Sequence, residues 1–230
     1  MKKIMTWIWK FLLKLVAAGI VLSILQVLTL KYIDPPFTPE VALEWIQSVI
    51  NHDPGRRPQY SFTKLEKISP NLQRAVLAGE DQRFLLHHGF DFREIHQAFM
   101  GMIKDHRLRG ASTITMQAAR SMFLLPSRSI ARKLAEMYYT VLMEIFWSKY
   151  RILEIYLNTI DWGTGVTGAQ AGSQKYFSKN AWNLTPAQAA LMAAVLPSPH
   201  KWSVTHPDAR VKARQRRIMK FMKMMKLPKI

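Results

Sequence analysis

Cysteine is absent from this chain of 230 residues, and acidic side chains are scarce. Without cysteine the protein has no disulfide framework and no cysteine-ligated zinc site. The 15 Asp and Glu stand against 33 Lys and Arg, so the formal net charge is +18 and anionic partners are favoured. A content of 49% hydrophobic residues, with 7 Trp, 7 Tyr and 11 Phe, exceeds that of a disordered basic chain. We therefore expect a folded protein.

Sustained alternation of apolar and polar residues, the pattern of a half-buried strand, is almost lacking as well. Apolar residues recur instead at helical spacing. This spacing predicts helices over residues 40–50, 70–85, 92–104, 112–123, 129–147, 149–158 and 185–195. The expected fold is mainly α, and the length beyond an N-terminal anchor suits a single domain.

The anchor is predicted from an apolar run over residues 11–30. At 1.5 Å per residue a helix of this length spans roughly 30 Å, the thickness of a bilayer core. Lys14 interrupts the run near one end, where its side chain can reach the headgroups. Four lysines lie before the apolar run or near its start, namely Lys2, Lys3, Lys10 and Lys14, and only Lys31 directly follows it. This asymmetry of positive charge places the N-terminus in the cytoplasm and the remainder outside. A cleaved signal peptide is the alternative, although no small-residue cleavage site follows.

Basic residues concentrate at the C-terminus, where residues 201–230 hold ten Lys and Arg against one Asp. A basic helix of this kind could bind nucleic acid, anionic lipid or an acidic substrate. A location outside the cytoplasm excludes nucleic acid and leaves the outer leaflet of the membrane as a partner. The alternative is a terminal helix that packs an apolar stripe on the core. The stripe comprises Val211, Ile218, Phe221, Met222 and Met225.

Two acidic positions are candidates for chemistry. Glu80 and Asp81 end a predicted helix, and Glu136 lies 56 residues after Glu80. Arg132 and Lys133 precede Glu136 by four and three positions, and the apolar stripe of its helix points the other way. Taken alone, the spacing around Glu136 indicates a solvated surface ion pair. An acidic pair at a helix end is also commonly solvated.

Ser112 follows Gly110-Ala111 and is expected to cap the helix over 112–123. A helix N-terminus that is rich in hydroxyl groups is also an anion site, and Arg120 and Arg128 follow on the same segment. Capping alone and phosphate recognition both explain this pattern.

Taken together, the segments resemble the family-51 glycosyltransferases, the peptidoglycan polymerases, and most closely the short membrane-bound monofunctional members. The resemblance covers about residues 70–200 and rests on motifs in the family's order. They are Glu80-Asp81-x-x-Phe84 with His87-His88-Gly89, Gly110 to Thr115 with Gln117, Arg132-Lys133-x-x-Glu136, Lys149 to Asn158, and Gly168 through Tyr176-Phe177 to Leu191.

The resemblance implies a lysozyme-like, two-lobed, α-rich catalytic domain with one N-terminal transmembrane helix. The expected division is anchor 1–31, linker and membrane-proximal segment 32–69, glycosyltransferase core 70–200 and basic C-terminal helix 201–230. It further implies a single-pass protein of the bacterial inner membrane with a periplasmic catalytic domain. The implied partners are lipid II, the growing glycan chain, membrane lipid, and proteins of the division or elongation machinery.

The implied reaction is polymerisation of lipid II into β-1,4-linked glycan by an inverting displacement that releases undecaprenyl pyrophosphate. By resemblance Glu80 is the general base, and Glu136 is a second essential acid that orients cations. The cations expected to stabilise the leaving group are Arg120, Arg128 and Arg132. The other residues expected to bind substrate are Asp81, Phe84, Ser112, Thr113, Gln117 and Lys133. No tightly bound cofactor is implied, but some members use Mg²⁺ or Mn²⁺, with Asp81 as a candidate ligand.

This chain departs from the family pattern at a few positions. Met116 replaces the first of two glutamines, Arg120 stands where lysine is commoner, and Gln170 and Gly172 lie in a stretch that is usually more apolar. Two other functions share features with the pattern. A lysozyme-like enzyme would cut glycan, and a degenerate membrane-anchored protein would only bind lipid II.

Overall fold

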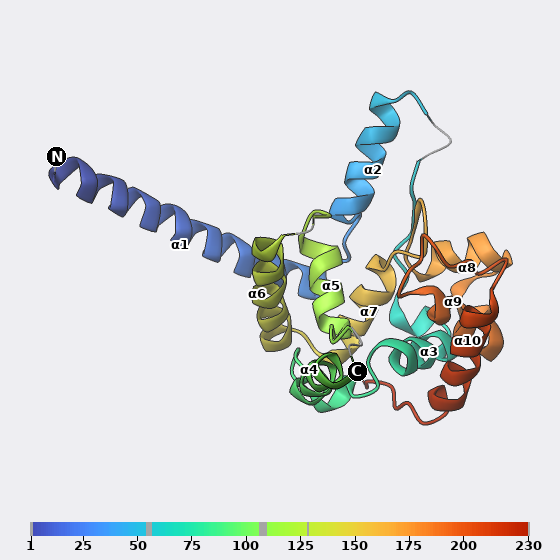
Figure 1. Ribbon diagram of the computed structural model, residues 1–230. Coiled ribbons are helices and arrows are strands. Elements are labelled where there is room, and N and C mark those ends of the chain that lie inside the picture. The colour runs from blue at the N-terminus through green and yellow to red at the C-terminus, as the bar shows by residue number, and fades with distance from the viewer. Residues whose placement is uncertain (1, 54–56, 106–109, 128, 230) are drawn as a thin grey trace. The chain divides into compact units, whose positions relative to one another are not determined.

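The computed structural model describes residues 2–53, 57–105, 110–127 and 129–229, without the side chain of residue 105 (Figure 1). It divides into two units, Met1–Pro35 and Pro36–Ile230. The first unit is helix α1 (Lys2–Tyr32), which is long and apolar enough to cross a membrane. A signal sequence has the same properties.

The second unit is mainly helical, as predicted. Its α-helices are α2 (Pro39–Ile50), α3 (Pro70–Glu80), α4 (Phe92–Asp105), α5 (Ile114–Phe123), α6 (Ile130–Phe146), α7 (Lys149–Thr159), α8 (Ala169–Phe177), α9 (Pro186–Val195) and α10 (Ala209–Met222). Short 3₁₀ turns are η2 (Leu65–Lys67), η3 (Phe84–Leu86) and η4 (Ala181–Asn183).

Two differences from the predicted helices have local causes. The helix expected over 70–85 ends at Glu80, because Asp81 takes an extended backbone conformation and the chain resumes as η3. Helix α8 was not predicted, since its sequence of alanine, glutamine, glycine and serine carries little apolar periodicity.

Two short strands join distant parts of the second unit. β1 (Gln59–Tyr60) pairs in parallel with β2 (Val166–Thr167), with Gln59 opposite Val166 and Tyr60 opposite Thr167. This pairing attaches the segment before α3 to the turn before α8.

The core forms where helices from distant parts of the sequence pack together. α3 packs on α9 and α10, while α5 packs on α6 and α7 (Figure 1). Helix α7 is buried from Arg151 to Thr159, including polar Glu154 and Asn158. These two side chains are satisfied by the preceding segment, because Glu154 accepts from the Leu65 N–H at 2.9 Å and Asn158 bonds the backbone of Thr63.

The basic C-terminal segment belongs to this core. Val211, Ile218 and Met222 of α10 are buried, and Asp208 caps the helix by accepting from the Val211 N–H. Of the two alternatives for this segment, the structure shows an apolar stripe packed on α3 and α9.

The orientation of α6 reverses the interpretation of its sequence. Its apolar stripe is exposed, from Ile130 at 82% to Leu134, Met137 and Val141. Glu136, expected on a solvated face, is only 2% exposed. The periodicity identified two faces correctly, but it cannot tell which face meets protein and which meets a lipid phase or a partner.

Helix α4 also exposes apolar side chains to its surroundings. Phe99, Met102 and Ile103 are all exposed. The exposed apolar surfaces of α4 and α6 therefore need an environment other than water.

Gly168 provides a test of this architecture. Its φ is +90°, and an added Cβ would lie 2.9 Å from the Asn158 carbonyl oxygen of α7. We expect Gly168→Ala to destabilise the protein by about 2 kcal/mol, lowering the thermal midpoint in detergent by roughly 5 °C. Gly101 is the matched control, because its added Cβ meets nothing within 4 Å. Gly101→Ala in a helix should leave the midpoint unchanged or raise it. Equal midpoints for both variants would contradict the close approach at Gly168.

Candidate active site

Glu80, the last residue of α3, lies at the centre of the candidate site. One carboxylate oxygen accepts from Arg214 Nη2 at 2.7 Å, and the other accepts from Gln117 Nε2 at 3.2 Å. The side chain retains 12% exposure. Arg214 belongs to α10 and also donates to the Gly79 carbonyl at 2.9 Å. Helices α3, α5 and α10 thus meet at one carboxylate.

The environment of Glu80 makes it a stronger base than an exposed glutamate. Burial raises the pKa of the Glu80 carboxyl, and the charge of Arg214 partly opposes this rise. Glu80 also lies at the C-terminal end of α3, where the helix dipole disfavours negative charge. The charge of Arg214 therefore favours the ionised carboxylate, while burial increases its affinity for a proton.

Gln117 connects Glu80 to the interior of α7. The Tyr156 hydroxyl donates to Gln117 Oε1 at 3.3 Å. Burial raises the pKa of Tyr156 well above its usual value, and the negative charge of Glu80 adds to the effect. The tyrosine therefore stays protonated and can act as the donor. This contact orients the amide of Gln117 so that its NH₂ group reaches Glu80.

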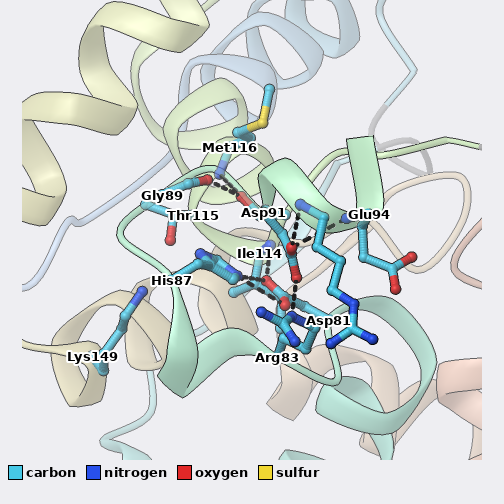
Figure 2. A network of polar contacts seen from close by, with 12 residues as sticks. Asp81, Arg83, His87, Gly89, Asp91, Glu94, Ile114, Thr115, Met116 and Lys149 are labelled. Atoms are coloured by element: carbon cyan, nitrogen blue, oxygen red, sulfur yellow. Dashed lines mark hydrogen bonds and ion pairs between the residues drawn. The ribbon is translucent and has the colours of Figure 1, made fainter. Parts of the chain in front are cut away.

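Asp81 has a different role from Glu80, although the two are adjacent. Its carboxylate oxygens each lie 3.0 Å from His87 Nε2, and Oδ2 also accepts from the Ile114 N–H at 3.0 Å (Figure 2). Asp81 is buried. A carboxylate of the protein itself thus meets the Ile114 N–H at the start of α5, so this N–H is not available to a phosphate.

The cap of α5 is also one residue later than expected. Thr113, rather than Ser112, accepts from the Met116 N–H, and its hydroxyl donates to the Gly89 carbonyl at 2.6 Å. Phe84 is fully buried beneath Lys149, whose Nζ lies 4.5 Å from the ring centroid. The structure therefore places Asp81, Phe84 and Thr113 in the buried framework around the site.

A cavity of about 580 Å³ opens beside Gln117. Its lining includes Arg120, Arg132, Tyr156 and Ser121. Arg120 is exposed on α5, one helical turn after Gln117. The cavity thus brings two predicted cationic residues to the residue that contacts Glu80.

Glu136 reaches the same cavity through Arg132. Glu136 accepts from Arg132 Nη1 at 3.0 Å and from Lys133 Nζ at 2.5 Å. Lys133 Nζ also lies 3.4 Å from the Ser112 hydroxyl. A nearly buried carboxylate therefore neutralises and positions two cations, so the ion pair expected from spacing is present but its carboxylate is not solvated.

Some site residues were not assigned from the sequence. Arg214 had one available signal, because it lies on the buried stripe of α10 between Val211 and Ile218, where a basic side chain is unexpected. Glu40 of α2 also lines the cavity. Burial, followed by the charge of Asp161, raises the pKa of Glu40. Arg128 lies outside the described residues.

The described residues do not fit a divalent cation at Asp81. Both of its oxygens already accept from His87 or Ile114. Within the described ranges, no three His, Asp or Glu side chains gather as a metal-ligand set.

Comparisons with known proteins identify relatives of the whole chain. A family model described as "Transglycosylase" matches residues 47–223. The chain is 41% identical to a biosynthetic peptidoglycan transglycosylase of Caulobacter vibrioides over 208 residues, 90% of this chain and 86% of the relative. A protein of the same name from Shewanella oneidensis is 42% identical over 96% of this chain and 92% of its own length. Another from Pseudomonas entomophila is 46% identical over 86% and 82%.

The contact between Arg214 and Glu80 can be tested through pH dependence. A base is active when ionised, so activity falls as pH decreases through its pKa. The Arg214 charge lowers the pKa of Glu80. We therefore expect Arg214→Met to move the acidic limb of the kcat/KM profile to higher pH by about 1 unit. Arg214→Lys retains the charge and should move it less. An unchanged limb in Arg214→Met, with a folded protein by circular dichroism, would exclude this pairing.

Proposed function

We propose a mechanism from the premise that this chain belongs to the transglycosylase family, the peptidoglycan glycosyltransferases. As a member, it is an enzyme that polymerises glycan strands in cell wall synthesis. The proposal concerns the substrate and the residues that carry the reaction. The observation that supports it most is the partly buried Glu80 carboxylate beside a cavity lined by Arg120 and Arg132.

Lipid II and the growing chain are the proposed substrates. The 4-hydroxyl of the acceptor GlcNAc attacks C1 of the MurNAc at the reducing end of the growing chain. The new O4–C1 bond is β, the α bond from C1 to the pyrophosphate oxygen breaks, and undecaprenyl pyrophosphate departs with the bonding electrons. Glu80 takes the hydroxyl proton, for which its raised pKa suits it, and later releases it to water.

Cationic side chains stabilise the charge that develops on the leaving pyrophosphate. Arg120 and Arg132 line the cavity and present guanidinium groups, which match phosphate oxygens in pairs. Glu136 holds Arg132 and Lys133 in place, so these cations do not reorganise when the charge develops. Gln117 positions Glu80, and Ser112 contacts Lys133. Arg128 is proposed as a further cation for the leaving group on the basis of the resemblance alone.

The membrane is the proposed location of this reaction. α1 is proposed to remain as a single-pass anchor, with the N-terminus in the cytoplasm and the second unit in the periplasm, because basic residues precede its apolar run. The exposed apolar faces of α4 and α6 suit the outer surface of the bilayer, where the lipid tail of the substrate resides. Division or elongation proteins are proposed partners. Asp81 is not proposed as a ligand of Mg²⁺ or Mn²⁺, because its carboxylate oxygens already accept from His87 and Ile114.

Lipid II turnover tests the role of Glu80. The full chain in detergent is mixed with lipid II, and polymer is separated from substrate on gels. We expect Glu80→Gln to reduce the rate by about 10³-fold or more, because the amide cannot accept the proton. Its binding of lipid II should persist. Polymerisation at the wild-type rate by Glu80→Gln would contradict the proposed base, and shortening of preformed glycan would favour a hydrolase.

The proposed contact of Arg120 with the leaving pyrophosphate can be tested separately. We expect Arg120→Ala to lower kcat/KM by about 10²-fold, because charge on the leaving group loses a partner. Arg120 is exposed, so the thermal midpoint should change little. Lys212→Ala, which removes an exposed charge from α10, is the matched control and should retain activity. Equal activity of both variants would remove Arg120 from the site.

A further inference from the structure

A second cavity lies apart from the catalytic one. It measures about 550 Å³, within the range of about 300–1,000 Å³ typical of small-molecule sites. Ser61 and Thr63 line one part of it, and Gln170, Asn180 and Trp182 line another. No residue of this lining also lines the catalytic cavity.

Helix α7 separates the two cavities. It lies between α5 and α8 (Figure 1). Tyr156 points toward Gln117 on the catalytic side. Glu154 and Asn158, one turn apart on the opposite face, bond the backbone of residues 63–65, which border the second cavity. The second cavity is therefore a site of its own.

Trp182 gives this cavity an aromatic wall. The side chain is 55% exposed on η4. An indole face left open to solvent next to amide and hydroxyl groups is the combination that binds sugars, because C–H groups of a pyranose pack on the ring while its hydroxyls find hydrogen-bond partners. Within the described residues, the Ser61 hydroxyl and the Trp182 N–H have no protein partner.

Gln170 explains why the aromatic wall is held in place. Its Oε1 accepts from the Ala181 N–H at 2.9 Å, and its Nε2 donates to Asn180 Oδ1 at 3.2 Å. Both ends of the amide thus fix the turn that carries Trp182. An apolar residue in place of Gln170 could make neither bond.

The charge of the cavity favours a neutral ligand. Glu66 and Lys67 are its two charged lining residues, and their formal charges cancel. Elsewhere the chain is strongly basic, with a net charge of +18. A phosphate or an anionic headgroup would find more favourable surfaces than this one.

We propose that this second cavity is a binding site for an amino-sugar chain, occupied by glycan that lies outside the catalytic cavity. The choice of β-1,4-linked N-acetylhexosamines as the ligand rests on the proposed function, whereas the presence of a saccharide site rests on the cavity itself. The site would hold the glycan strand close to the enzyme, and its residues would not touch the reacting atoms.

The test measures binding of a neutral β-1,4-linked N-acetylglucosamine tetramer to the full chain in detergent, by calorimetry and by tryptophan fluorescence. We expect saturable binding that Trp182→Ala weakens by about tenfold. Trp182→Phe keeps an aromatic face and should lose about threefold or less. Trp182 is exposed, so neither change should impair folding, which the thermal midpoint checks.

Arg120→Ala is the control for binding in the catalytic cavity and should leave the affinity for the tetramer unchanged. No saturable binding, or equal affinity in Trp182→Ala and wild type, would overturn the site. If Arg120→Ala loses tetramer binding while Trp182→Ala retains it, the proposed site would also be overturned, because the sugar would then occupy the catalytic cavity. These readouts use no turnover, so a failed secondary site is distinguishable from a failed polymerase mechanism.

Discussion

The contact between the Asp81 carboxylate and the start of α5 organises the catalytic region. Asp81 follows the last residue of α3, and it accepts from the Ile114 N–H while it pairs with His87. This buried anion at a helix N-terminus joins α3 to α5. It consequently sets the distance between Glu80 and Gln117, which belong to the same two helices. Of two adjacent carboxylates, Asp81 thus belongs to the framework, whereas Glu80 lies beside the cavity as the proposed base.

Much of the fold could be predicted because helical periodicity is a local property. The helices from α2 to α7 and α9 follow the apolar spacing, and the family resemblance is confirmed by the comparisons. The interpretation of faces was less successful. The apolar stripes of α4 and α6 are exposed and Glu136 is buried, because hydrophobic spacing identifies an apolar face without identifying the phase that it contacts. α8 was missed because small residues pack there, as at Gly172, where a Cβ would meet Met192 and Trp162.

The candidate site was predicted by motif order, and the arrangement of its members was not. Glu80, Gln117, Arg120 and Arg132 gather at one cavity or its border. Asp81, Phe84 and Thr113 occur in the same motifs, yet their side chains are buried in the framework, since a motif records residues needed for folding and for chemistry alike. Arg214 lies 134 positions from Glu80, outside the recognised motifs. Its place on the buried stripe of α10 marks it as unusual, but no local pattern identifies Glu80 as its partner.

That distance has a consequence for the order in which the enzyme is assembled. All the recognised motifs precede α10 in the sequence, so Glu80 lacks the cation that lowers its pKa until α10 has docked on α3 and α9. Contacts between residues so far apart in sequence slow folding. A protein without α10 would therefore carry every recognised motif but not the charge that lowers the pKa of Glu80. The electrostatic environment of the proposed base thus depends on a helix outside the motifs that identify the family.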